Sequence, residues 1–217
     1  GEVLGITCNA DSALARGFPG TIVARAVSER SVTQTQSFST MLLLAQMSIF
    51  EAMERGNLLS SLRRLPELAR KGIRDWERLG RGLAETEGLR DFFFLGSGPN
   101  YGLACAMMLA MKEMSLSHTE AYHFMEFRHG PKAMLDECSL VVGLGCDEAR
   151  GEELAVMEEV RSLGAQTIMF PNDLVPGEEI SRLPQWTRGI LYLPAIQFRS
   201  LALAVLKGLD PDCPRHL

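Results

Sequence analysis

The chain has 217 residues, of which 46% are hydrophobic and 23% charged, an ordinary balance for a globular protein. Its 27 acidic and 22 basic side chains give a formal net charge of -5, so no basic field exists that would attract nucleic acid or an anionic membrane. Five cysteines without a CxxC pair fit free thiols in a reducing cytosol better than a disulfide framework. No signal-peptide pattern is present, and no apolar run approaches the ~20 residues that span a bilayer. We therefore expect a cytoplasmic protein that binds neither nucleic acid nor membrane.

The first 59 residues read as part of a domain. Strands are predicted at residues 3–8 and 21–26, and a helix with a largely apolar surface at residues 38–53. Two strands and one helix cannot close a core alone. This segment is therefore either the end of a longer domain or packs onto the second domain or a partner chain.

Residues 60–88 are rich in Arg, Glu and Leu, with apolar residues at roughly helical spacing. This pattern is typical of an exposed amphipathic helix or helix pair. We interpret the segment as a helical linker between two domains.

Residues 89–217 alternate between short apolar runs and helical patterns. Strands are predicted at 92–95, 140–144, 167–170 and 190–193, and helices at about 99–114, 150–163 and 195–207. Nearly all-apolar strands separated by helices are typical of a parallel sheet that helices cover on both faces. The predicted fold class is therefore α/β, with a complete second domain.

A glycine-containing turn, Gly96-Ser97-Gly98, joins the first of these strands to the next helix. Glycines permit a tight turn, and the amino terminus of a helix offers free N–H groups to an anion. A phosphate or sugar contact and a plain turn capped by Asn100 explain the motif equally well.

The helix at 99–114 is apolar almost all round and should be buried; its only charged residues are Lys112 and Glu113, in the last turn. The helix dipole and burial both disfavour a carboxylate there, which predicts a raised pKa for Glu113. Such a group suits a general base. The alternative is a surface Lys/Glu pair where the helix emerges into water.

Residues 117–135 contain three histidines and two glutamates among aromatic side chains. Glu126 and His129 stand at i and i+3, but His118 and His123 fit no usual zinc pattern. We therefore expect neither a metal nor another cofactor. The mixture predicts a structured loop, which forms a site or braces the fold through a polar network.

The segment ERSVTQTQSFSTM, residues 29–41, places six hydroxyl side chains and two glutamines around the start of the first long helix. Side chains of this kind cap helices, and they also bind sugar hydroxyls and phosphate. Both interpretations remain open for this segment.

Three separated motifs resemble a known family. MKEMS at 111–115, TEAYHFMEFRHGP at 119–131 and KGLDPDCPRHL at 207–217 occur in the order found in sugar isomerase (SIS) domain proteins. The chain resembles in particular the isomerase half of glucosamine-6-phosphate synthase and related isomerases and deaminases of amino-sugar phosphates. The resemblance implies tandem SIS domains that pair into a homodimer. Residues 1–59 would end the first domain, 60–88 would be the linker, and 89–217 the second domain.

The resemblance also implies site residues. Glu113 matches the glutamate that moves a proton between the first two sugar carbons, and His129 matches the histidine that opens the sugar ring from across the dimer interface. Val32, Gln34 and Thr35 match the segment that lines the sugar pocket. The implied partner is a phosphorylated sugar or amino sugar, isomerised or deaminated without glutamine hydrolysis.

The sequence departs from the synthase pattern in three places. Ala110 stands where the synthase has a lysine, a second lysine would lie beyond Leu217, and nothing before Val3 resembles the Ser/Thr-rich phosphate loops. We therefore expect weak sugar-phosphate binding and little turnover from this chain. Two alternatives to an enzyme are a non-catalytic module that binds a sugar phosphate as a regulatory signal, and a fragment whose second domain serves dimerisation.

Overall fold

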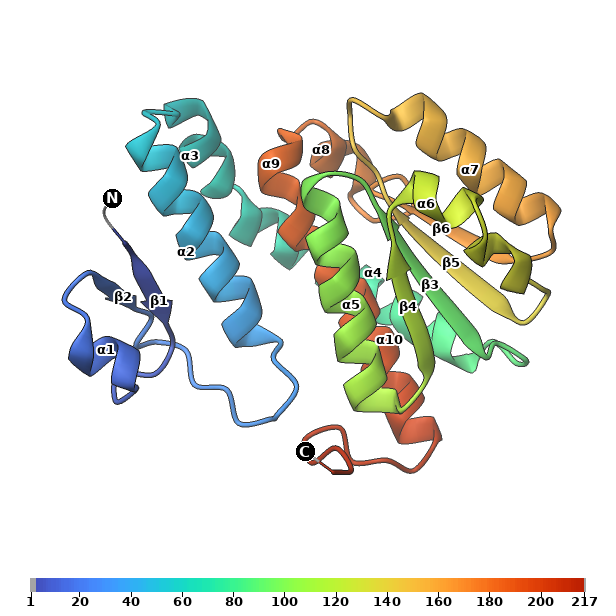
Figure 1. Ribbon diagram of the computed structural model, residues 1–217, viewed down its shortest axis with the longest axis horizontal. Coiled ribbons are helices and arrows are strands. Elements are labelled where there is room, and N and C mark those ends of the chain that lie inside the picture. Colours follow the sequence, from blue (N-terminus) through green and yellow to red (C-terminus); the bar gives the residue numbers. More distant parts are fainter. Residues whose placement is uncertain (1–2, 217) are drawn as a thin grey trace.

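A computed structural model describes residues 3–216, in which a small amino-terminal lobe stands beside a larger α/β unit (Figure 1). The lobe contains β1 (Gly5–Thr7), α1 (Ala13–Gly17) and β2 (Thr21–Val23), and its two strands pair in parallel. Both predicted strands are confirmed, although each has only 3 residues. Helix α2 (Gln36–Ala52) confirms the next prediction and runs between the lobe and the larger unit.

Two further helices, α3 (Gly56–Leu62) and α4 (Leu65–Glu85), lead into the larger unit. Helix α4 confirms the amphipathic helix predicted within residues 60–88. The charged face of α4 is exposed. Its apolar face is not, because Leu68 and Trp76 are buried and α4 packs along α10 (Leu193–Leu206). The apolar stripe of this connecting segment therefore belongs to the core of the larger unit.

A four-stranded sheet in the order β4-β3-β5-β6 forms the centre of the larger unit, and all its neighbouring strands are parallel. The strands are β3 (Asp91–Gly96), β4 (His118–Tyr122), β5 (Ser139–Leu144) and β6 (Gln166–Phe170). The pairing of Phe92 with Leu140 joins the two central strands. This arrangement confirms the predicted α/β fold with a parallel sheet.

Helices lie on both sides of this sheet. On one side, α4, α5 (Pro99–Ser115) and α10 pack with alternate residues of the central strands, including Phe92 and Phe94. On the other side, α6 (Phe124–Arg128) and α7 (Arg150–Ser162) pack with Phe93. The remaining connections contain the short helices η1 (Pro131–Met134), α8 (Gly177–Ser181), α9 (Gln185–Arg188) and η2 (Gly189–Tyr192).

Two predicted segments are wrong. Residues 118–122, expected within a loop, form the edge strand β4, whose exposed flank accounts for its mixed composition. Residues 190–193, expected to be a strand, lie in η2 and the start of α10. A four-residue apolar run fits a buried helical turn as well as a strand. Pro194, in the first turn of α10, favours the start of a helix.

The stretch Gln185–Leu206 has 22 residues and is long and apolar enough to cross a membrane by length and composition alone. This stretch contradicts the expectation that no apolar run approaches the length that spans a bilayer. Half of its most apolar window is buried inside the protein, where α10 packs against α4 and α5. In this structure it comprises α9, η2 and the core helix α10 of the larger unit.

Helices α4 and α10 approach closely at Gly80. A Cβ at this position would lie 2.7 Å from the Ala195 carbonyl oxygen and 2.7 Å from the Arg199 backbone nitrogen. Because backbone atoms cannot move aside, we expect Gly80→Ala to lower the free energy of unfolding by about 1–3 kcal/mol. Gly82→Ala, on the same helix with no atom within 4 Å of the added Cβ, should instead raise it by about 0.5–1 kcal/mol. Urea unfolding measures both, and equal effects would contradict the close crossing.

Candidate active site

A cleft lies between the amino-terminal lobe and the helices α5 and α10, and it consists of adjoining cavities. The inner cavity, of about 240 Å³, is lined by α5, α10 and residues 32–38. The outer cavity, of about 660 Å³, lies between residues 28–35 and α10, and the lobe cavity, of about 650 Å³, opens beyond β1 and β2. Gln197 lines both the inner and the outer cavity, and Gln34 lines both the inner and the lobe cavity. The three cavities therefore adjoin one another.

Three of the predicted site residues lie together in the inner cavity. Glu113, in the last turn of α5, lines it together with Val32 and Gln34 from the segment before α2. Glu113 is half-buried, whereas Val32 and Gln34 are exposed. Thr35 is the N-cap residue of α2 and lines the outer cavity instead.

The inner cavity is largely apolar around Glu113. Among its described lining residues, Glu113 is the one ionisable side chain, and the walls include Phe38, Met107 and Ile196. A carboxylate in an apolar pocket is suited to taking a proton from carbon. Ala110 lies one turn before Glu113 on the same wall, so a methyl group rather than a charged side chain faces the cavity beside the candidate base.

Glu29 holds the segment between β2 and α2 in shape. Its Oε2 accepts hydrogen bonds from the Thr35 N–H at 3.0 Å, the Ser37 N–H at 2.9 Å and the Ser37 hydroxyl at 2.9 Å. Burial disfavours its charge, but the hydrogen bonds from Ser37 and Thr35 outweigh burial and hold the pKa of Glu29 below its ordinary value. The carboxylate thus caps the amino end of α2, where free N–H groups attract negative charge. The residues enclosed by these bonds include Val32 and Gln34.

Two cations lie at the carboxyl end of α5, where unpaired carbonyl groups carry negative partial charge. Lys207 donates from Nζ to the Ser115 carbonyl oxygen at 2.9 Å and to the Ser117 hydroxyl at 2.8 Å. Arg199 is 1% exposed and its guanidinium lies 4.2 Å from the centre of the Phe92 ring. Burial lowers the pKa of Arg199 to about 10, and burial together with the charge of Arg199 lowers the pKa of Lys207. The Lys207 hydrogen bonds join the carboxyl ends of α5 and α10 and hold the last turn of α5, which carries the candidate base.

His129 lies outside this cleft. It follows α6, is exposed, and lines none of the inner, outer and lobe cavities. The resemblance assigns it to the site of a second subunit. The charged residues beside it have a structural role in this chain, because Arg128 and Lys132 both pair with Glu159 of α7. Among residues 3–216, no group of three or more His, Cys, Asp or Glu side chains is placed to hold a metal ion.

Side chains of the protein itself occupy the space beside the turn Gly96-Ser97-Gly98. Asn100 donates from Nδ2 to the Gly145 carbonyl oxygen at 2.8 Å, and Gly98 rather than Asn100 is the cap residue of α5. Glu153 is fully buried, and its Oε2 accepts the Cys146 N–H at 2.8 Å. Burial raises the pKa of Glu153, and hydrogen bonds from Cys146 and Ser97 oppose that rise. A carboxylate of the protein thus lies at the sheet edge where phosphates bind in related topologies, which favours the plain turn.

Two residues of the cleft were not predicted from the sequence, Glu29 as a capping residue and Gln197. The polar run at 29–41 indicated capping. Glu29, however, lies six and eight residues before the N–H groups of Thr35 and Ser37 that it caps, and this spacing matches no known capping motif. Gln197 is an isolated amide in the apolar helix α10. An amide in such a helix is a signal in itself, since a polar group there needs a partner.

Comparison with known proteins identifies the fold. A helix-covered parallel sheet with a concave, largely apolar site is typical of small-molecule-binding α/β domains. Residues 90–183 match the family model described as the SIS domain. Over 97% of its length it is 32% identical to the glutamine–fructose-6-phosphate aminotransferase (isomerizing) of Pseudomonas putida. Over 100% of its length it is 29% identical to the protein of the same name from Pyrococcus horikoshii.

Solved structures show the same fold. A glucosamine-6-phosphate deaminase from Thermotoga maritima superposes with a TM-score of 0.77 at 26% identity, over 99% of this chain and 65% of that chain. A tagatose-6-phosphate ketose/aldose isomerase from Escherichia coli gives 0.73 at 19% identity, over 99% and 63%. The chain spans 38% of the length of each aminotransferase and thus corresponds to part of these relatives.

The cap formed by Glu29 predicts a pH-dependent loss of stability. Glu29→Ala should lower the free energy of unfolding by about 0.5–2 kcal/mol near neutral pH, as loss of a helix cap does. Because its pKa is lower in the folded protein than the ordinary 4.5, its stabilisation is present above pH 4.5 and is lost as the pH falls through the folded-state value. Unfolding curves of parent and variant from pH 7 to pH 3 should therefore converge. Glu51→Ala, an exposed residue of α2, is the control, and a pH-independent difference at Glu29 would contradict the cap.

Proposed function

We propose that this protein acts on an aldose or ketose 6-phosphate, or on the corresponding amino-sugar phosphate, by proton transfer between C1 and C2 without glutamine hydrolysis. One observation carries the proposal: Glu113 stands in a largely apolar cavity opposite Val32 and Gln34. The names of the relatives support this substrate class, since they include a glucosamine-6-phosphate deaminase and isomerizing aminotransferases of fructose 6-phosphate.

Proton transfer between neighbouring carbons needs a base that is shielded from water and close to both carbons. In the proposed mechanism, Glu113 takes the proton from one carbon of the open-chain sugar and returns it to the other. The Gln34 side chain offers a donor and an acceptor to sugar hydroxyls, while Val32 excludes water from the opposite wall. His129 of a second subunit would assist ring opening. Isomerisation is completed when the hydroxyl proton moves between O1 and O2 of the enediol, so it consumes no co-reactant. Release of ammonia from an amino-sugar phosphate would in addition consume one water.

A second candidate function is non-catalytic binding of a sugar phosphate. The observation that favours it is Ala110, which is 8% exposed and lines the inner cavity one turn before Glu113. An alanine there can neither pair with a substrate oxygen nor transfer a proton. Binding without turnover would support this function.

Replacement of Glu113 separates the two functions. Glu113→Gln keeps the shape of the side chain and removes its basicity, so we expect binding of fructose 6-phosphate within a few-fold of the parent. In a version of the protein that includes the phosphate loops, exchange of the carbon-bound hydrogen of fructose 6-phosphate with deuterated solvent, followed by NMR, should fall by roughly 10²–10⁴. Lys112→Gln, at the exposed neighbouring position, is the matched control. Exchange that persists in Glu113→Gln would show that another group is the base.

We further propose that the protein is a homodimer. Helix α2 exposes a row of apolar side chains, with Ile49 54% and Met53 58% exposed, and His129 lies away from the cleft of its own chain. A stable interface should bury more than about 1,000 Å² and include residues 118–131. A monomer in sedimentation at micromolar concentration would contradict this.

Mixed dimers test whether His129 serves the partner's cleft. If it does, a dimer of one Glu113→Gln chain and one His129→Gln chain contains one intact site and one doubly altered site. Each variant alone should show little hydrogen exchange, and dissociation and reassociation of the mixture should restore about a quarter of the parent activity from statistical pairing. No recovery, although subunits demonstrably exchange, would place His129 in its own chain's site or outside catalysis.

A further inference from the structure

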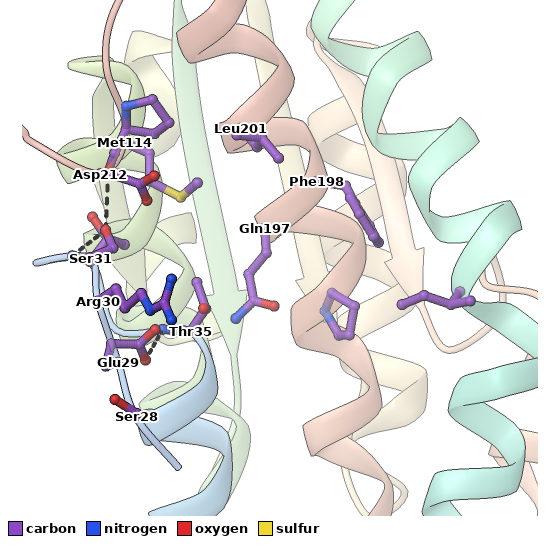
Figure 2. A pocket seen from close by; sticks show the side chains of 14 residues that line it. Ser28, Glu29, Arg30, Ser31, Thr35, Met114, Gln197, Phe198, Leu201 and Asp212 are labelled. Atoms are coloured by element: carbon purple, nitrogen blue, oxygen red, sulfur yellow. Dashed lines mark hydrogen bonds between the residues drawn. The ribbon is translucent and has the colours of Figure 1, made fainter. Parts of the chain in front are cut away.

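Helix α10 presents a nearly uniform apolar wall to the cleft. Its residues that line the inner and outer cavities are Leu193, Pro194, Ile196, Gln197, Phe198 and Leu201. Gln197 is the one polar side chain in this set. It projects from α10 toward the segment that carries Glu29, Arg30 and Thr35 (Figure 2).

The amide of Gln197 has no internal role in the described part of the chain. Within residues 3–216 neither its oxygen nor its nitrogen makes a hydrogen bond, whereas Gln185 and Gln46 both use their amides to bind backbone or side-chain groups. A second unpaired group lies across the outer cavity. Thr33 is 2% exposed, and its hydroxyl lacks a partner among the described residues. Polar groups without partners are unusual at buried positions and need a ligand or water.

The position of Gln197 connects the two cavities. It lines the inner cavity together with Glu113 and the outer cavity together with Thr35. A ligand whose reacting carbons lie at Glu113, and whose remaining atoms extend into the outer cavity, must therefore pass the Gln197 amide.

We infer that Gln197 is a specificity-determining residue that hydrogen-bonds the sugar portion of the ligand, an inference that rests on the proposed function. A carboxamide both donates and accepts, so it can bind a hydroxyl in either direction and accept from an amino group. An apolar wall without this amide would bind the carbon skeleton without distinguishing its substituents. A site that pairs with a particular hydroxyl or amine discriminates strongly, because the wrong ligand leaves a polar group unpaired.

The test compares sugar phosphate with phosphate alone. Dissociation constants for fructose 6-phosphate and inorganic phosphate are measured by calorimetry in the parent, in Gln197→Leu and in Gln166→Leu, the last an amide removed from an exposed site on β6. We expect Gln197→Leu to weaken fructose 6-phosphate binding about tenfold, the effect of one lost hydrogen bond. Inorganic phosphate affinity and the unfolding midpoint should stay unchanged, and Gln166→Leu should match the parent.

A second variant tests selectivity. Gln197→Glu keeps the length of the side chain and introduces a carboxylate that favours the ammonium group of glucosamine 6-phosphate over a hydroxyl. The ratio of affinities for glucosamine 6-phosphate and fructose 6-phosphate should rise about tenfold over that of the parent. The inference is overturned if both variants bind the two sugar phosphates with the affinities of the parent. It is also overturned if their affinity for inorganic phosphate falls as much as their affinity for fructose 6-phosphate. If the parent binds neither sugar phosphate, the proposed function fails and the inference with it, so the parent and the variants report on separate claims.

Discussion

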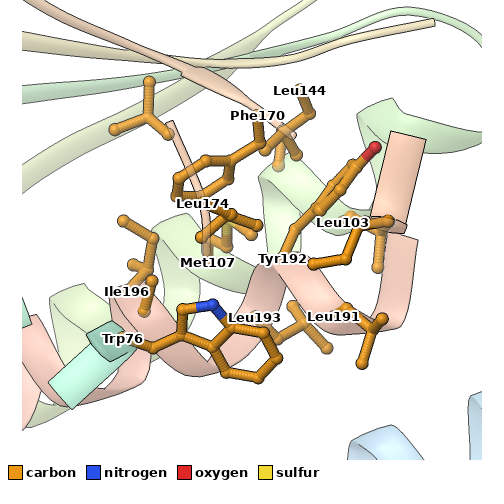
Figure 3. Packing of buried hydrophobic residues seen from close by; sticks show 14 of the residues in the cluster. Trp76, Leu103, Met107, Leu144, Phe170, Leu174, Leu191, Tyr192, Leu193 and Ile196 are labelled. Atoms are coloured by element: carbon orange, nitrogen blue, oxygen red, sulfur yellow. The ribbon is translucent and has the colours of Figure 1, made fainter. Parts of the chain in front are cut away.

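Helix α5 is packed between the sheet and α10, and this burial places the candidate site. Its residues Leu103 and Met107 lie in one cluster with Phe170 of β6, Trp76 of α4 and Ile196 of α10 (Figure 3). Because interiors are close-packed, a helix held on both sides cannot shift without opening cavities. Its last turn therefore has a defined position relative to α10. The side chain of Glu113 is half-buried because it stands where α5 leaves this core.

The opposite wall of the cleft is built differently. The segment before α2 has few apolar anchors, and its shape depends on hydrogen bonds, chiefly those that Glu29 accepts from Thr35 and Ser37. The Ser31 hydroxyl donates to the Pro211 carbonyl oxygen at 3.2 Å and joins this wall to the carboxyl-terminal segment. One wall is thus fixed by packing and the other by polar contacts that water can replace. Motion that admits a ligand is expected in the second wall, since regions with few buried apolar contacts open most easily.

The predictable part of this structure was the part governed by local patterns. Buried strands and α5 follow from continuous apolar runs, whereas residues 190–193 were assigned wrongly because so short a run carries no periodicity. The edge strand β4 was missed because exposure mixes its composition. Physical reasoning from the residues proposed Glu113 as a base. The resemblance named Val32 and Gln34, which line the same cavity as Glu113, and Thr35, which lines the outer cavity. The lone amide of Gln197 marks a residue that needs a partner, but its place in the cleft could not be foreseen, because the side of α10 that faces the cleft is decided by packing against α4.

The polar groups of the cleft fall into two sets. Glu29 and Ser37 satisfy one another, so the protein needs them for its own shape. Glu113 and Gln197 line the inner cavity and make no side-chain hydrogen bond to another described residue. A folded chain gains nothing by leaving a carboxylate and an amide unpaired on largely apolar walls, because each forgoes the stabilisation of a hydrogen bond. Both groups are half-buried on cavity walls where a bound sugar could pair with them, which is the pattern of a site organised for its ligand rather than for stability.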